Sequence, residues 1–191
     1  MSPLFLHPLL LLLITTLTSA LPLHPATNAL LTDISALDHA IRAATNAIAA
    51  YPGGTQPYEP LRAANAQLIR RNRIAYNDAL TLPPQSIDTS TQIIDQVASP
   101  ILPDIDAYVA ALLRQHDLIA AAGLERETAT TLEVVASDHD TLSLAVGARL
   151  SPVTLGCAVP AARARGRWAV EAGGAGVWGV PLAPLVVPVD G

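Results

Sequence analysis

A stripe of apolar residues at helical spacing runs through most of this 191-residue chain. It begins with Ile34, Leu37, Ile41, Ala44 and Ile48, and it resumes in three further segments up to about residue 150. Residues three or four positions apart lie on one face of a helix, so this pattern predicts amphipathic helices. Aromatic residues make up only 4% of the chain, so the stripe consists mainly of Ile, Leu, Val and Ala. Such helices must cover one another or some external apolar material.

Turn and cap signals divide the stripe into separate helices. Proline and glycine interrupt a regular helix, whereas Ser, Thr and Asp are favoured at its N-terminal cap. The predicted fold class is all-α, an antiparallel bundle of four to five amphipathic helices with a poorly ordered C-terminal tail. We expect a first helix from Thr27 or Thr32 to Ala50 and a second from Glu59 or Pro60 to the pair Pro83 and Pro84. A third should begin at Ser86 or Asp88, with a kink or break at Pro100 and Pro103. Gly123 should act as a C-cap, and a fourth helix should follow it.

The composition changes along the chain and predicts three regions. Residues 1–20 contain an apolar run from Leu9 to Leu17 and then small side chains, which predicts a secretion signal peptide cleaved after Ala20. Residues 21–152 form the predicted helical bundle domain, with no transmembrane segment in the mature chain. Residues 153–191 are rich in Gly, Ala, Arg and Pro without helical periodicity. We interpret them either as a real tail of low order or as the product of a misread exon boundary.

Charge and reactive residues narrow the range of functions. The formal net charge is -5 and the chain contains no lysine, which argues against nucleic acid as a partner because its phosphates require clustered cations. The one cysteine, Cys157, cannot form an intramolecular disulfide. The sequence lacks a nucleophile elbow, a phosphate-binding glycine loop and paired histidines at zinc spacing, so we predict no enzyme activity, no cofactor and no metal site. We interpret His139 as a histidine at the edge of the core, and the scattered acidic residues as groups that confer solubility.

Several segments of the chain resemble a known family of secreted proteins. These segments are TDISALDHAIRAATNAIAAYPGG, IIDQVASPILPDIDAYVAALLRQHDLIAAAGL and LEVVASDHDTLSLAVGARLSP. Together with the leader they make the chain similar to the fungal hydrophobic surface binding protein A family, which includes cell-wall galactomannoproteins, from Ala29 to Pro152. The resemblance implies an exported helical bundle without catalytic residues that associates with the cell wall or is released. It also implies adsorption to apolar surfaces or uptake of lipid.

Two functions are consistent with the stripe and the resemblance. In the first, a secreted noncatalytic protein lays its apolar helix faces on a hydrophobic solid surface or lipid, or associates with the cell wall, with cell-wall polysaccharide as a further partner. In the alternative, the bundle stays closed and carries a fatty acid or sterol in an apolar cavity between helices. The same side chains are also consistent with ordinary core packing. The candidate contacts for the apolar ligand or surface are Ile41, Ile48, Leu68, Ile105, Leu112, Leu142 and Val146.

Overall fold

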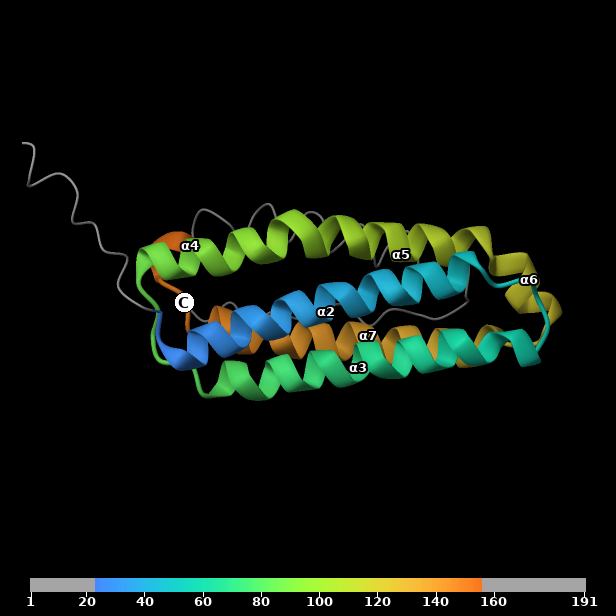
Figure 1. Ribbon diagram of the computed structural model, residues 1–191, viewed down its shortest axis with the longest axis horizontal. Helices are drawn as coiled ribbons and strands as arrows, with labels where there is room; N and C mark the ends of the chain where they lie inside the picture. Colours follow the sequence, from blue (N-terminus) through green and yellow to red (C-terminus); the bar gives the residue numbers. More distant parts are fainter. Residues whose placement is uncertain (1–22, 156–191) are drawn as a thin grey trace, which may run out of the picture.

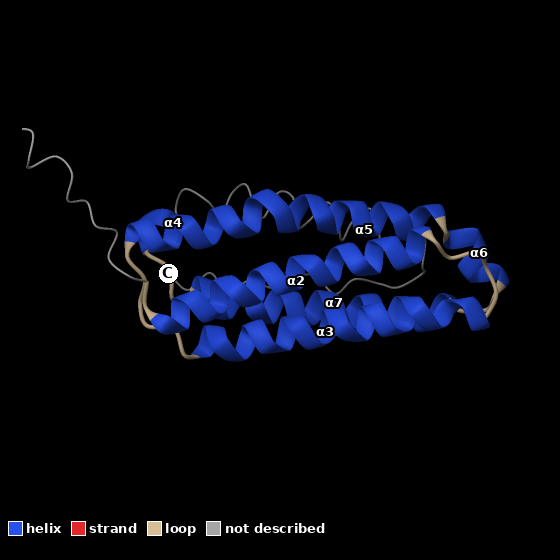
Figure 2. Cartoon of the chain, in the orientation of Figure 1, coloured by secondary structure: helices blue, strands red, loops and turns tan. Residues whose placement is uncertain are grey.

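The computed structural model describes residues 23–155, and all regular structure in this range is helical (Figure 1). The predicted all-α fold class is therefore confirmed. Figure 2 shows long helices lying side by side in an elongated bundle, with no strand among the described residues. The signal peptide expected over residues 1–20 lies outside the described residues, as does the expected tail beyond residue 155.

The described helices follow the segments expected from the sequence. The third segment is divided in the structure, because a π-helical turn, η2, joins two α-helices there. In chain order the elements are α2 (Pro25–Ala49), η1 (Gln56–Tyr58), α3 (Glu59–Leu80), α4 (Ile87–Gln96), η2 (Val97–Ile101), α5 (Leu102–Arg114), α6 (His116–Ala121) and α7 (Glu125–Gly147).

Local side-chain chemistry explains two of the helix boundaries. Ser86 caps α4, because its hydroxyl oxygen accepts a hydrogen bond from the backbone N–H of Thr89 at 3.2 Å. Gly123 follows α6 with a φ of 71°, in the left-handed region that glycine adopts without strain. Both boundaries agree with the sequence prediction.

The start of α2 differs from the expected caps, Thr27 and Thr32. The ring of His24 accepts a backbone N–H and so acts as the cap, and Pro25 suits the first helical position because its missing N–H is not needed there. Thr27 lies inside the helix, where it is buried and donates a hydrogen bond of 3.0 Å to Gln85. The helix therefore begins earlier than predicted.

The two prolines of the third segment produce a wide helical turn. Pro100 lies inside η2, and the π-helical turn accommodates a residue that lacks a backbone N–H and crowds the preceding turn. Pro103 lies in the first turn of α5, where a proline is tolerated. Helical residues therefore run without a break from α4 through η2 into α5, and the local change at Pro100 is a π-helical turn. A further interruption at Gln115, between α5 and α6, was not predicted because the apolar stripe continues across it to Ile119.

Helix α2 is central to the packing, because both α3 and α5 lie against it. In Figure 1, α2 and α5 run in one direction and α3 and α7 run in the opposite direction, so long helices that follow one another in sequence are antiparallel. Helix α7 packs on α3 and runs parallel to it, and an ion pair of 2.7 Å joins Arg73 to Asp138 between them. Helix contacts therefore proceed in the order α5, α2, α3, α7. The backbones of α5 and α7 do not approach each other as closely as those of these three pairs.

A single hydrophobic core joins these helices. Its members are mainly Leu, Ile and Ala, and it includes Tyr51, Tyr58 and Tyr108. Burial of this apolar surface is the main favourable contribution to folding. The most deeply buried aliphatic side chains are Leu30, Leu37, Ile48, Leu61, Leu82, Ile93, Ile101, Leu112 and Ile119.

Buried hydrogen bonds fix how the helices face one another. The hydroxyls of Tyr58 and Thr128 share a bond of 2.6 Å between η1 and α7. Tyr108 of α5 donates a bond of 2.9 Å to Oδ1 of Asn65 in α3, across the interior of the bundle. Because a buried polar group without a partner is costly, each bond favours one register of the helices that it joins.

One pair of carboxyl groups opposes the packing of α2 on α3. Asp33 of α2 faces Asp78 of α3, and one oxygen of Asp33 is buried without a hydrogen-bond donor. The pKa of Asp33 is raised to about 6, mainly by burial and also by the hydrogen bond and charge repulsion with Asp78, whereas the charge of Arg71 lowers it. A proton shared between the two carboxyl groups would supply the missing donor.

A second pair of carboxyl groups joins α2 to α5. Asp38 is only 4% exposed, so the expectation that acidic residues serve solubility is wrong at this position. Burial raises the pKa of Asp38, as does its hydrogen bond with Asp104 of α5, whereas the charge of Arg42 lowers it. Arg42 bonds to Asp38 and lies 3.5 Å from Asp104, so a single guanidinium group serves both carboxylates.

We predict that Asp33→Asn stabilises the protein near neutral pH and has little effect in acid. The folded-state pKa of about 6 exceeds the ordinary value of 3.8, so the folded protein binds this proton more tightly than the unfolded chain does. The stability contributed by the proton is complete below pH 3.8 and is lost as the pH rises through about 6. Thermal unfolding at about pH 4 and about pH 7 measures the difference in stability between the variant and the parent protein. A difference that does not change with pH would contradict the prediction, and Asp106→Asn at an exposed position of α5 is the control.

We also predict that Tyr58→Phe lowers the free energy of unfolding by about 1 kcal/mol. The substitution removes the bond to Thr128 but keeps the ring, whose centre lies 5.5 Å from that of Tyr51. Urea unfolding of Tyr58→Phe, Thr128→Val and the double variant measures the coupling between the two hydroxyls. If Tyr58→Phe costs as much in the Thr128→Val background as in the parent, the shared bond is not the cause.

Candidate functional site

The seven residues predicted to contact an apolar ligand or surface belong to the core or its edge. Six of them are buried, and Ile105 is half-buried against the same core. They come from four helices, so the tertiary structure gathers them into one cluster. Burial is equally consistent with ordinary core packing, and their contact with a ligand stays a prediction. They are Ile41 and Ile48 of α2, Leu68 of α3, Ile105 and Leu112 of α5, and Leu142 and Val146 of α7.

The side of the bundle between α5 and α7 differs from the other three sides. Close helix packing forms the α2–α3, α2–α5 and α3–α7 sides, whereas the backbones of α5 and α7 lie further apart. Both helices nevertheless contribute apolar residues to the core, among them Leu112 from α5 and Leu142 from α7. Separating α5 from α7 would disrupt fewer helix contacts than opening any other side. Among the described residues, this side is the candidate entrance for an apolar chain.

Two asparagines of α3 place amide groups inside this apolar core. Asn65 is 4% exposed and accepts the bond from Tyr108. Asn72 lies two turns further along the same helix face, is 1% exposed, and its Oδ1 has no hydrogen-bond partner among the described residues. In the sequence, Asn72 stands at a position of the helical repeat where an apolar residue is expected, between Leu68 and Ala75. A polar residue at a core-facing position was the signal that could have marked it as functional.

The core contains no positively charged group. None of the buried residues in the described range is an arginine. His139 is half-buried on α7, as expected for a histidine at the edge of the core. Burial lowers the pKa of His139 and the charge of Asp140 offsets part of the effect, so the imidazole is neutral near pH 7. Burial also raises the pKa of Tyr108 above its ordinary value, which keeps its phenol protonated. An ionised ligand would therefore find no counter-ion among the buried residues of the described range.

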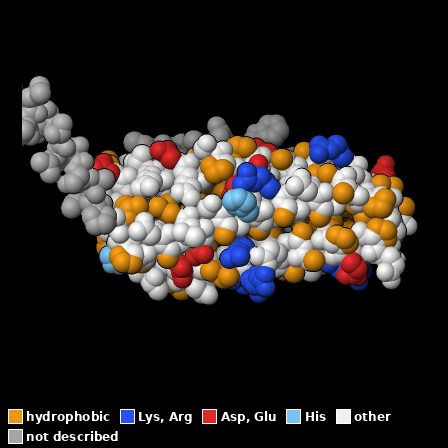
Figure 3. All heavy atoms as spheres, viewed as in Figure 1, with side chains coloured by type: hydrophobic (Ala, Val, Ile, Leu, Met, Phe, Trp, Pro, Cys, Tyr) orange, Lys and Arg blue, Asp and Glu red, His pale blue; other side chains and the backbone are white. Residues whose placement is uncertain are grey.

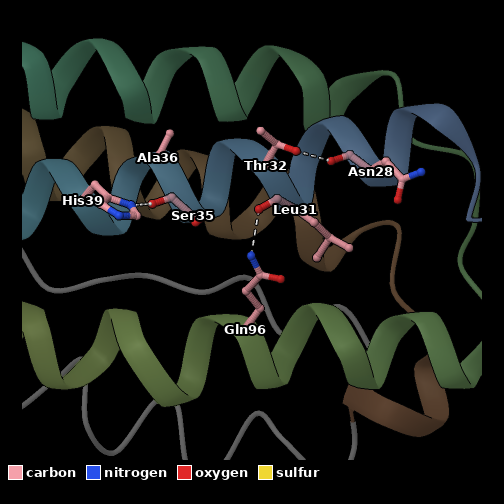
Figure 4. A pocket seen from close by; sticks show the side chains of 7 residues that line it. All are labelled: Asn28, Leu31, Thr32, Ser35, Ala36, His39 and Gln96. Atoms are coloured by element: carbon pink, nitrogen blue, oxygen red, sulfur yellow. Dashed lines mark hydrogen bonds between the residues drawn. The ribbon is translucent and has the colours of Figure 1, made fainter.

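A shallow groove of about 640 Å³ lies between α2 and the end of α4 (Figure 4). Across it, Gln96 donates a bond of 2.8 Å to the backbone carbonyl of Leu31. Polar side chains that line the groove form hydrogen bonds within α2. The hydroxyl of Thr32 donates to a backbone carbonyl, and Nδ1 of His39 lies 2.7 Å from another backbone carbonyl oxygen. The groove includes none of the seven predicted residues, so it is not the predicted apolar site. Its lining residues are Asn28, Leu31, Thr32, Ser35, Ala36, His39 and Gln96.

Hydrophobic side chains on the outer surface are dispersed. In Figure 3 they occur along the length of the visible face, and basic side chains gather near its middle. Between residues 23 and 155, no helix has the length and apolar character needed to cross a bilayer. The same residues contain no cluster of three or more His, Cys, Asp or Glu that could hold a metal ion. The exposed large hydrophobic residues are Ile74, Leu80, Ile87, Leu118, Leu144 and Val153.

Three solved structures share this fold. Afmp4p in complex with palmitic acid is 20% identical with a TM-score of 0.68, and the match covers 76% of this chain and 97% of that one. Ligand binding domain 1 of the Penicillium marneffei MP1 protein, complexed with arachidonic acids, is 18% identical with a TM-score of 0.70. That match covers 78% of this chain and 95% of that one. Ligand binding domain 2 of the same protein, complexed with multiple arachidonic acids, is 16% identical with a TM-score of 0.59. That match covers 76% of this chain and 92% of that one.

The sequence itself matches one family. No curated protein sequence matches the chain significantly. The sequence model described as hydrophobic surface binding protein A matches residues 16–148, which is more than half of the chain. This match agrees with the resemblance seen in the amphipathic segments, and this chain therefore belongs to the hydrophobic surface binding protein A family.

Proposed function

We propose that this protein is a noncatalytic binding protein that takes the hydrocarbon chain of a fatty acid into its core between α5 and α7. The observation that carries the proposal is the wider separation of the α5 and α7 backbones on the side where both helices supply core residues. Solved proteins of the same fold hold palmitic or arachidonic acid, which supports a hydrocarbon chain as the ligand. The seven core residues predicted from the sequence would contact it.

Burial of hydrocarbon supplies the free energy for this binding. Each methylene group removed from water contributes about 0.8 kcal/mol, so a long acyl chain contributes about 10 kcal/mol before costs. The costs are the loss of ligand freedom and the displacement of core side chains. Because the α5–α7 side lacks direct helix packing, the displacement should cost least there.

Adsorption to a hydrophobic solid is the second candidate function. The description of the family as hydrophobic surface binding supports it. The exposed hydrophobic residues come from several helices, among them α3, α4, α6 and α7. Strong adsorption would therefore use the inner faces of the helices, after α5 and α7 have separated. On this mechanism, lipid and solid surface compete for the same apolar residues.

The place of action that we propose is outside the cell, either at the wall or released from it. The predicted signal peptide and the membership in the family support export. Cell-wall polysaccharide is a further proposed partner. Fractionation of the producing cells into medium, wall and cytosol tests this proposal, and retention of the chain in the cytosol with its leader uncleaved would contradict it.

We predict that Ile105→Trp weakens the binding of palmitic acid about tenfold, which corresponds to about 1.4 kcal/mol. The larger side chain would fill space on the inner side of α5 without adding charge to the core. Fluorescence displacement measures the affinity, and native mass spectrometry detects the retained lipid. The matched control is Ile74→Trp on α3, where the side chain is 37% exposed. Absence of any retained lipid in the parent protein would overturn the proposal.

We further predict that a saturating amount of palmitic acid slows the loss of the protein from solution onto polystyrene. A bound acyl chain stabilises the closed bundle and occupies the apolar residues that adsorption requires. The adsorption rate with and without palmitic acid is measured by the protein left in solution. Decanoyl sucrose at the same concentration controls for coating of the plastic by an amphiphile. Equal rates with and without palmitic acid would show that adsorption uses the outer surface.

A further inference from the structure

Asn72 is a buried polar side chain whose hydrogen-bonding capacity the described fold does not use. It is 1% exposed, and its Oδ1 accepts no bond from any described residue. A buried acceptor without a donor costs about 1–3 kcal/mol, and the great majority of such groups in folded proteins are satisfied. By contrast, Asn65 on the same helix face is satisfied by Tyr108.

The position of Asn72 places its amide inside the bundle. The bond between Asn65 and Tyr108 shows that this face of α3 looks across the interior toward α5. Asn72 lies seven residues further along α3, which is about 10 Å in a helix. Because α3 and α5 are antiparallel, the same step along α5 leads from Tyr108 to Ile101, the last residue of the π-helical turn η2. Ile101 is itself 1% exposed.

Helix α7 contributes a second polar side chain at this level. Arg73 and Asp138 form an ion pair between α3 and α7. Asn72 and His139 are the sequence neighbours of these two residues, so they lie at the same height in the bundle. Burial keeps His139 neutral, and its ring can accept or donate one hydrogen bond. Asn72 and the half-buried His139 are therefore neutral polar groups at this level, whereas Arg73 is exposed and none of the described buried residues is a cation.

We infer that the amide of Asn72 binds the polar end of the lipid, and that the preferred lipid carries an uncharged hydroxyl group there. The inference rests on the proposed function, because a lipid must first enter the core. A hydroxyl hydrogen satisfies the free Oδ1 of Asn72, whereas an ionised carboxylate would bring a charge into a core without a counter-ion. Fatty alcohols carry such a hydroxyl, and so does the undissociated carboxyl group of a fatty acid.

The test compares two lipids that differ only in this donor. 1-Dodecanol keeps its hydroxyl proton at neutral pH, and dodecyl methyl ether has the same chain with the hydroxyl methylated. Displacement of a fluorescent fatty-acid analogue from the full mature chain gives both affinities. The parent protein should bind the alcohol about fivefold to tenfold more tightly than the ether, as expected for one buried hydrogen bond.

Asn72→Leu should abolish this preference. Leucine has a similar size and no acceptor, so the variant should bind the ether at least as tightly as the parent does. Asn77→Leu is the matched control, because Asn77 lies on the same helix and is exposed; it should keep the preference for the alcohol. If Asn72→Leu does not fold, the side-chain amide resonances of Asn72 in the 15N-labelled parent provide a second readout. They should shift when the alcohol is added and not when the ether is added.

The outcomes separate this inference from the proposed function. If both lipids bind the parent equally, or if Asn72→Leu keeps the preference for the alcohol, the role of Asn72 is overturned while lipid binding stands. If the fluorescent fatty-acid analogue binds but neither lipid displaces it, the inference is overturned while the proposed function stands. If the analogue itself does not bind, the proposed function and the inference are both overturned.

Discussion

The packing of α3 and α5 on α2 is the interaction on which the rest of the bundle depends. Helix α2 carries buried residues along its whole length, from Leu30 to Ile48, and the other long helix, α7, reaches it only through α3. Three helix pairs therefore supply the direct packing of the bundle, and the α5–α7 side contributes little. A protein built in this way can separate one pair of helices while three contacts remain intact. That asymmetry is the basis of our proposal that an apolar chain enters the core between α5 and α7.

Polar groups in the core are of two kinds. Tyr58 with Thr128 and Tyr108 with Asn65 form satisfied pairs that set helix register. Asn72 has an acceptor without a partner, and so does Asp38. Satisfied pairs stabilise one arrangement of the helices, whereas unsatisfied groups reduce stability and are retained where they serve another purpose. For Asn72, the proposed purpose is recognition of the polar end of a lipid.

The carboxyl groups on α2 connect helix packing to acidity. Asp33 faces Asp78 of α3, and Asp38 faces Asp104 of α5, so both of the main packing surfaces of α2 contain a carboxyl pair. The guanidinium of Arg42 directly offsets the negative charge of Asp38 and Asp104. The charge of Arg71 offsets that of Asp33 only in part. Protonation should therefore tighten the α2–α3 contact more than the α2–α5 contact.

The amino-acid sequence predicted the helices, several of their ends and the family. Ser86, Pro103 and Gly123 act through local backbone chemistry, so their effects are visible without a fold. It also identified the seven apolar residues as a set, because helical periodicity specifies which face of each helix is buried. Periodicity does not specify which helix covers that face. Three features emerge only in the folded bundle, because each depends on side chains that are distant in sequence. The backbones of α5 and α7 lie further apart than those of the packed pairs, Asp38 is buried, and Oδ1 of Asn72 has no partner among the described residues.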